Sequence, residues 1–263
     1  MIGIVIVSHS KQLAEGVREL AAQMAQGKVP LAVAAGIDDP ENPLGTDAMQ
    51  VYEAIASVYS DEGVVILMDL GSALMSAEMA LEFLTTEQQQ KVHLCEAPLV
   101  EGAVAAAVAA ASGSNIQQVM AEARGALTAK ATQLGVNTSP SFVSSQEQTT
   151  NNQEQTTKEI HLTIRNRLGL HARPAAKFVS TAARFQSQIL VSNLTIGTAA
   201  VRADSINQVA TLVARQGHKL AIAATGVDAD EALSALQALI DSNFGEQETP
   251  LPHSLLPTPY SLL

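Results

Sequence analysis

This sequence contains a single cysteine, no tryptophan and no long apolar run. It contains one cysteine, Cys95, among 263 residues, which excludes an internal disulfide and a cysteine-rich zinc site. The longest apolar runs, at 63–68 and 103–111, fall short of the ~20 residues that a membrane-spanning helix needs. No basic stretch followed by an apolar segment opens the chain. We therefore expect a soluble cytoplasmic protein.

Motifs for nucleotides and metals are also missing. The sequence has no Walker loop, no Rossmann glycine set and no nucleophile elbow, and its His, Cys and Asp residues lack metal-site spacing. We therefore expect this chain to bind no cofactor and no metal. Aromatic residues make up 3% and hydrophobic residues 47%, which predicts an aliphatic core and excludes disorder throughout.

Charge and composition divide the chain into two modules. Residues 1–137 carry a net charge of −10 and residues 158–245 carry +3, within a total of −11. Between the modules, 15 of the 20 residues at 138–157 are Ser, Thr, Asn or Gln, which predicts a flexible linker. Residues 246–263 contain four prolines and are interpreted as a second linker or a tail. The acidic first module argues against nucleic acid as a partner.

Alternating strands and helices are predicted in the first module. Apolar runs at 2–7, 31–35, 64–68 and 92–94 are typical of strands buried on both faces, and helical patterns separate them. This order predicts an α/β fold with a mainly parallel, doubly wound sheet. The side chains expected to face the core are Leu13, Val17, Leu20, Ala21 and Met24 in the first helix, and Met49, Tyr52 and Ile55 in a second helix with Thr46 as its N-cap. A third helix is expected from about 72 to 84.

The second module has the predicted order βαββαβα. Its strands are expected at 160–164, 187–191, 195–200 and 218–224. One helix carries Ala175, Phe178, Val179 and Ala182 on a single face, and two more are expected at 204–213 and 228–244. We interpret this as an α+β open-faced sandwich, in which helices cover one face of a single sheet.

His9 and Asp69 each follow a predicted buried strand. The carboxyl ends of parallel strands meet at one edge of a sheet, where ligands bind near helix N-termini. If the two strands are neighbours, the Asp69 carboxylate can orient the imidazole and leave its other nitrogen as a nucleophile. The simpler alternative is that His9 caps a helix and Asp69 is an ordinary loop acid.

Several neighbours of this pair could bind an anion. Gly71 and Ser72 begin the predicted helix after Asp69 and offer backbone N–H groups and a hydroxyl. Ser8 and Ser10 flank His9 and could add further donors. We therefore include Ser72 among the candidate supporting residues.

His171 lies in the segment NRLGLHARPAAKF, at the start of a predicted helix. Gly169 suits a turn, Leu170 can anchor it to the core, and Pro174 fits the first helical turn. The guanidinium of Arg173 can pair with phosphate oxygens. A nucleophilic imidazole beside an anion-binding helix start is what phosphoryl acceptance requires, whereas the simpler alternative is a solvated helix start.

Residues 158–245 resemble HPr, the phosphocarrier of the bacterial phosphoenolpyruvate-dependent phosphotransferase system (PTS). The resemblance rests on GLHARPAA at 169–176. It implies phosphorylation of His171 on Nδ1, with assistance from Arg173. Ser205 falls where some HPr proteins carry a regulatory serine, but its flanking residues differ, and we predict no regulation there.

Residues 1–135 resemble the IIA domains of the mannose PTS family, and more closely the phosphotransfer subunits of dihydroxyacetone kinases, the DhaM family. The matching segments are IVIVSHS, AAGIDDPENPLGTDA, MDLGSALMSAE and APLVEGAVAA. The resemblance implies phosphate on Nε2 of His9, orientation by Asp69 through Nδ1, and a homodimer formed through this module.

The order of the two modules is that of multidomain DhaM proteins. It implies a relay from phosphoenolpyruvate through enzyme I, His171 and His9 to ADP held with Mg in the subunit DhaL, whose ATP serves the dihydroxyacetone-binding subunit DhaK. Some members continue into an enzyme I-like domain, and the proline-rich tail resembles the linker to it. The sequence ends after this tail, either because the protein is naturally short or because it is truncated, and in both cases we expect this chain to need enzyme I in trans. Two alternatives are a sugar-transport IIA–HPr fusion that serves a IIB domain and a regulatory phosphoprotein.

Overall fold

A four-stranded parallel sheet forms the centre of the first module in the computed structural model, which describes residues 1–134 and 157–246. Its strands are β1 (Gly3–Ser8), β2 (Leu31–Ala35), β3 (Val64–Met68) and β4 (Val92–Cys95), in the order β2-β1-β3-β4. All three strand pairs are parallel, and β1 and β3 are neighbours, with Val7 opposite Met68. The prediction of a parallel α/β fold is therefore confirmed.

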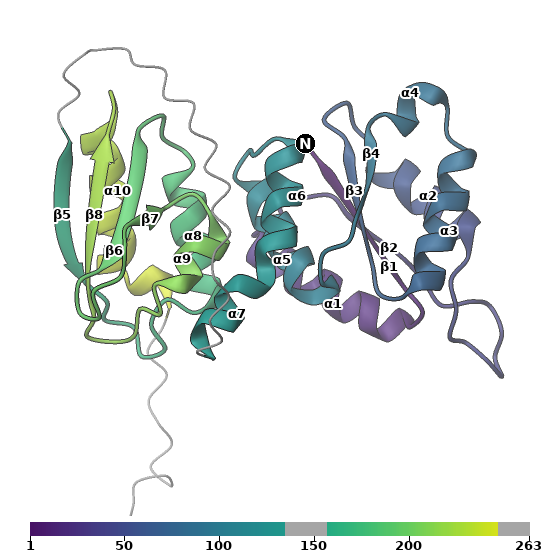
Figure 1. The fold of residues 1–263 in the computed structure, drawn as a ribbon, viewed down its shortest axis with the longest axis horizontal. Coiled ribbons are helices and arrows are strands. Elements are labelled where there is room, and N and C mark those ends of the chain that lie inside the picture. Colours follow the sequence, from purple (N-terminus) through teal and green to yellow (C-terminus); the bar gives the residue numbers. More distant parts are fainter. Residues whose placement is uncertain (135–156, 247–263) are drawn as a thin grey trace, which may run out of the picture.

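Helices cover both faces of this sheet (Figure 1). One face is covered by α1 (Lys11–Met24), α5 (Leu99–Ala111) and α6 (Ile116–Arg124), and the other by α2 (Ala48–Val58) and α3 (Gly71–Glu82). A short helix, α4 (Thr86–Gln89), precedes β4, and a 3-10 turn (Gly125–Leu127) leads into α7 (Thr128–Gln133). The rim where β1 and β3 end is thus bordered by helices from both layers.

Some details of the helices predicted in the first module were wrong. The N-cap of α2 is Asp47, whose side chain accepts a hydrogen bond from the Gln50 N–H, and the Thr46 hydroxyl instead contacts Ser76 at 2.8 Å. Asp47 is one residue nearer the helix, so it can reach the N3 amide. Met49 is 49% exposed. Because the helical phase places Val51 and Ala54 in the core instead, Met49 turns outward. Two residues expected to be buried in α1, Leu13 and Leu20, are also exposed.

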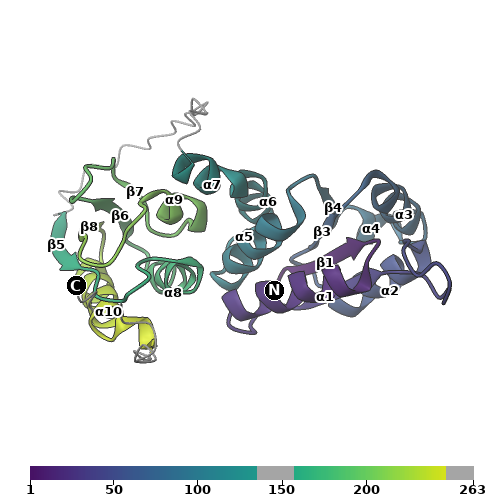
Figure 2. The same cartoon turned by 90° about the horizontal axis from the view of Figure 1, so that it is seen from below.

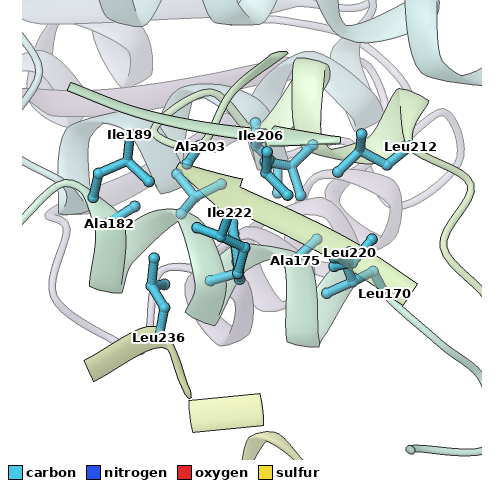
Figure 3. Close-up of a cluster of buried hydrophobic side chains, with 14 of the residues drawn as sticks. Leu170, Ala175, Ala182, Ile189, Ala203, Ile206, Leu212, Leu220, Ile222 and Leu236 are labelled. Carbon is cyan, nitrogen blue, oxygen red and sulfur yellow. The ribbon is translucent and has the colours of Figure 1, made fainter. Parts of the chain in front are cut away.

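The second module is an antiparallel sheet covered on one face by helices. Its elements in chain order are β5 (Lys158–Thr163), α8 (Ala172–Ala182), β6 (Gln188–Asn193), β7 (Val201–Arg202), α9 (Ile206–Thr211), β8 (Lys219–Thr225), α10 (Ala229–Asp241) and a 3-10 turn (Asn243–Gly245). The strand order is β5-β8-β6-β7. Side chains from the sheet, such as Ile222, pack against Ala175 and Leu236 from the helices (Figure 3). The predicted βαββαβα order is confirmed.

The strand expected at 195–200 was wrong. Residues 194–197 form a turn, and the short strand β7 begins only at Val201. The N–H groups of Gly197 and Thr198 both donate to the Asn193 carbonyl, which turns the chain. Gly197 has φ = +70°, a conformation that favours glycine and ends the extended pattern.

The two modules pack against each other through helices. Met24, Ala105 and Val108 of the first module belong to the same apolar cluster as Phe178 and Val209 of the second. Figures 1 and 2 both place α8 and α9 between the second sheet and α5. At the edge of this contact, Asn207 Nδ2 donates to the Glu122 carbonyl at 2.6 Å. In both views, α2 and α3 lie on the far side of the first module.

Parts of the predicted linker (138–156) and tail (247–263) lie outside the described ranges. Within residues 1–134 and 157–246, no helix is both long and apolar enough to cross a membrane. The same ranges contain no group of three or more His, Cys, Asp or Glu side chains that could hold a metal ion.

Candidate functional site

The backbone brings His9 and Asp69 together at the carboxyl edge of the parallel sheet. His9 follows β1, and Ser10 is the N-cap of α1, so His9 occupies the tight connection between strand and helix. Asp69 follows the neighbouring strand β3, and its backbone N–H donates to the Val7 carbonyl at 3.2 Å. Adjacent strand ends therefore set the two side chains opposite each other.

The Asp69 carboxylate is held by several donors. Its Oδ2 accepts hydrogen bonds from the Ser8 hydroxyl at 2.8 Å and from the His9 backbone N–H at 2.9 Å, while Oδ1 faces His9 Nδ1 at 2.9 Å. Burial opposes ionisation of this carboxyl, but hydrogen bonds from the His9 N–H, the Ser8 hydroxyl, the His9 ring and the Leu70 N–H together hold its pKa below the ordinary value. Asp69 is therefore a fixed, ionised acceptor.

An ionised Asp69 determines which nitrogen of His9 carries the proton. A carboxylate can only accept, so Nδ1 must be the donor, and in the neutral imidazole Nε2 therefore keeps its lone pair. Nε2 lies 2.5 Å from the Ser72 hydroxyl, which is then the donor in this contact. The arrangement prepares Nε2 as a nucleophile, and the hydroxyl is placed where it can turn toward an incoming oxygen anion.

The N-terminus of α3 faces the same nitrogen. Gly71 and Ser72 are its first two residues, and the N-cap Leu70 makes no side-chain hydrogen bond to the helix. The first backbone N–H groups of a helix have no partner within it and favour a negative charge nearby. Thr46 contacts this turn through the Ser72 carbonyl at 3.4 Å and the Ser76 hydroxyl. The structure thus places an anion-binding helix start beside His9 Nε2.

His171 lies at a second helix start, in the other module. It is the N-cap residue of α8, and its side chain makes no capping hydrogen bond. Gly169 precedes it with φ = +69°, and a Cβ there would lie only 2.2 Å from the Ala214 carbonyl oxygen, so this turn requires glycine. Leu170 is buried, and its N–H donates to the same carbonyl at 2.8 Å. These contacts fix the backbone that carries His171.

The environment of the His171 ring is asymmetric. Its Nε2 is buried and lies 2.9 Å from the Glu246 carboxylate oxygen Oε1, but the contact does not have the alignment of a hydrogen bond. Arg173 is exposed in the first turn of α8, and Pro174 is the third helical residue. Because Nε2 is covered, we expect Nδ1 to be the nitrogen that meets a reaction partner.

The two histidines are not brought together by the packing of the modules. His9 lies beside the N-terminus of α1, at the carboxyl edge of the sheet, and contacts Ser72 of α3. The second module instead contacts Met24, at the opposite end of the 14-residue helix α1. A helix of this length spans ~21 Å. His9 and His171 therefore form two separate sites.

Glu246 was not predicted to be near either site, because it begins the segment interpreted as a proline-rich tail. A usable signal was Phe244, the last residue of the helix predicted at 228–244, because a large apolar side chain there indicates that the chain still packs against the core. The helix α10 itself ends earlier, at Asp241. Ser8 was considered as an anion donor, but it is buried and its hydroxyl is directed to Asp69. Ser10 likewise serves as a helix N-cap.

Two families match separate parts of the chain. Residues 3–120 match the family described as the PTS system fructose IIA component, and residues 158–242 match the PTS HPr component phosphorylation site. These ranges contain His9 and His171, respectively.

Two curated relatives match different shares of the chain. The phosphoryl donor subunit DhaM of the PEP-dependent dihydroxyacetone kinase from Escherichia coli is 46% identical over 98% of this chain and 54% of that protein. The DhaM subunit of PEP-dependent dihydroxyacetone kinase 2 from Listeria innocua is 44% identical over 41% of this chain and 85% of that protein. The chain spans about half the length of the longer curated relatives it matches.

Among solved structures, the crystal structure of HPr-C-His from Thermoanaerobacter tengcongensis is similar to part of the chain. It is 46% identical and covers 34% of this chain and 98% of its own, with a TM-score of 0.32.

Proposed function

Because this chain belongs to the DhaM family of phosphoryl donor subunits, we propose that it carries phosphoryl groups on His171 and His9 toward a dihydroxyacetone kinase. The observation that carries this proposal is the arrangement at His9, where an ionised carboxylate holds Nδ1 and leaves Nε2 beside a helix N-terminus. A phosphoryl carrier needs a nucleophilic nitrogen and fixed positive dipoles for the transferred group, and no more.

The proposed relay begins with phosphoenolpyruvate and enzyme I. Nδ1 of His171 attacks the phosphorus, and the bond to the donor breaks. Nε2 of His9 then attacks the same phosphorus, and the electron pair of the broken N–P bond returns to Nδ1 of His171. ADP held with Mg in DhaL is the final acceptor, and its ATP phosphorylates dihydroxyacetone on DhaK. This chain itself holds no cofactor in the proposed relay.

The supporting residues have distinct proposed tasks. Asp69 keeps the proton on Nδ1 of His9, and Ser72 with the Gly71 N–H binds the phosphoryl oxygens once the hydroxyl turns away from Nε2. Arg173 neutralises charge on the group at His171. We further propose that the first module forms the homodimer of its family and that the relay operates in the cytoplasm.

Direct transfer from His171 to His9 needs a movement of the modules. In the packing described above, α8 is held against α5 and the C-terminal end of α1, away from His9. The second module must therefore leave this surface, or a second chain must supply one of the two histidines. Covalent tethering raises the effective concentration of the released module near His9.

Reconstitution with enzyme I, DhaL, DhaK, ADP and phosphoenolpyruvate tests the assignment. His9→Ala should still accept phosphate at His171 but should not support dihydroxyacetone phosphorylation. His171→Ala should accept no phosphate from enzyme I. A matched control is His161→Ala, which removes an exposed histidine of β5 and should keep full activity. Kinase support by His9→Ala, or transfer to a IIB domain instead of DhaL, would refute the proposal.

A further inference from the structure

We propose that Glu246 is a positioning residue for His171: its carboxylate holds Nε2 and so directs phosphoryl transfer to Nδ1. The inference rests on the proposed function, in which His171 is the first acceptor. It assigns a role to a residue that lies 75 positions from the histidine, just after the last turn of the second module.

The contact between the two side chains is the first observation. Glu246 Oε1 lies 2.9 Å from His171 Nε2, and this nitrogen has almost no contact with solvent. No hydrogen bond within the described ranges satisfies Nε2. A buried ring nitrogen beside a carboxylate favours the N–H form at that nitrogen, because an unprotonated Nε2 would set a lone pair against the negative charge.

The backbone that delivers Glu246 is the second observation. Asn243, Phe244 and Gly245 have φ values of +56°, +56° and +67°, so three successive residues are left-handed. This conformation is costly for a bulky residue such as Phe and persists only where the surroundings enforce it. Phe244 is 1% exposed, and its carbonyl accepts a hydrogen bond from Lys177 Nζ of α8 at 2.6 Å. The turn reverses the chain after α10 and brings Glu246 back to the helix that begins at His171.

Asn166 connects the carboxylate to the loop that precedes His171. Its Nδ2 donates to the Gly169 carbonyl at 2.6 Å and lies 3.4 Å from Glu246 Oε2. One carboxylate oxygen therefore faces the ring while the other faces an amide that is itself fixed to the active-site turn.

The chemical consequence concerns the charge on the ring. When the Nδ1 lone pair forms its bond to phosphorus and the donor bond breaks, the ring keeps its Nε2 proton and becomes positively charged. The Glu246 carboxylate lies where it stabilises this charge. The same contact prevents Nε2 from acting as the nucleophile, so one side chain influences both the rate and the site of phosphorylation.

The test uses the full chain with Glu246→Gln, which keeps the size of the side chain and removes its charge. Glu159→Gln is a matched control, because Glu159 Oε1 lies 2.7 Å from Nε2 of the exposed His161. Long-range ¹H–¹⁵N NMR should show the proton of His171 on Nε2 in the unaltered chain and in Glu159→Gln. In Glu246→Gln this preference should be lost, and phosphorylation by enzyme I should slow about tenfold.

A second variant separates positioning from folding. Glu246→Asp keeps the charge and should restore part of the rate and of the Nε2–H form, and circular dichroism should show equal folding of all variants. An unchanged tautomer and an unchanged rate in Glu246→Gln would overturn the role of Glu246. A chain that never takes phosphate at His171 would instead refute the proposed function, and the NMR measurement would still decide the role of Glu246.

Discussion

The His9 and His171 sites each pair an imidazole with a carboxylate, but the carboxylate contacts Nδ1 in the first site and Nε2 in the second. In each, an imidazole sits at the start of a helix and a carboxylate lies 2.9 Å from one of its nitrogens. Asp69 takes Nδ1 of His9 and leaves Nε2, whereas Glu246 covers Nε2 of His171 and leaves Nδ1. The comparison leads us to propose that the position of the carboxylate, and not the imidazole itself, decides which nitrogen accepts a phosphoryl group.

The two carboxylates differ in how firmly they are held. Asp69 follows a strand of the central sheet and also accepts hydrogen bonds from the Ser8 hydroxyl and the His9 backbone N–H. Glu246 follows a left-handed turn at the end of the second module, and its contact with the ring is not aligned. We therefore expect the His9 site to depend more strongly on its carboxylate.

Of the two carboxylate substitutions, Asp69→Asn should slow phosphoryl transfer more than Glu246→Gln. An amide can donate to Nδ1, which would move the ring proton to Nε2 and remove the nucleophile. Transfer from phosphorylated His171 to His9 should slow by about 10- to 100-fold, against about tenfold for the Glu246→Gln step at His171. Single-turnover transfer followed by rapid quench measures both steps.

The matched control for this variant is Asp61→Asn, at a 92% exposed carboxylate that pairs with Lys91. It removes the same charge from the same module and should leave transfer unchanged. Should Asp69→Asn transfer as fast as the unaltered chain, Asp69 would be an ordinary loop acid. Loss of the fold in this variant would favour a structural role.

A smaller effect on transfer is expected from a change at Glu122, whose carboxyl lies between the two packed modules. Burial between the modules raises the pKa of its carboxyl above the ordinary value, against opposing hydrogen bonds from the Ser205 hydroxyl and the Asn207 N–H. The packed state thus binds the proton more tightly than the separated state. Packing should be strongest below the ordinary carboxyl pKa and weaken as the pH rises through the raised pKa.

Fluorescence energy transfer between labels on the two modules measures this packing. The packed fraction should fall with rising pH in the unaltered chain, and Glu122→Gln should remove most of that dependence and slow transfer between the histidines a few-fold. Glu87→Gln, at an exposed position of α4, is the control. Equal pH dependence in Glu122→Gln and the control would show that this carboxyl does not govern the packing.

The larger elements of the fold could be predicted because their signals are local. Buried runs gave the parallel strands, and the helical face that contains Phe178 and Val179 gave α8. Adjacent strands then brought His9 and Asp69 together, as the position of both residues after buried strands had indicated. Such arrangements can be predicted from hydrophobic periodicity and the geometry of a parallel sheet alone.

Features that depend on tertiary contacts could not be predicted in this way. The apolar pattern at 195–200 suits a strand, but hydrogen bonds to the Asn193 carbonyl turn the chain instead. Thr46 and Asp47 are both good N-caps, and only the backbone phase of α2 selects Asp47. Glu246 reaches His171 because of the left-handed turn at 243–245. The only sign of this turn in the sequence is the large apolar residue Phe244.

The identity of the phosphorylated nitrogens tests the central claim most directly. The full chain would be phosphorylated with enzyme I and phosphoenolpyruvate, and ¹H–³¹P and ¹H–¹⁵N NMR would locate each phosphoryl group, with His9→Ala and His171→Ala assigning the signals. We predict phosphate on Nε2 of His9 and on Nδ1 of His171. Phosphate on the same ring nitrogen of both histidines would contradict the account.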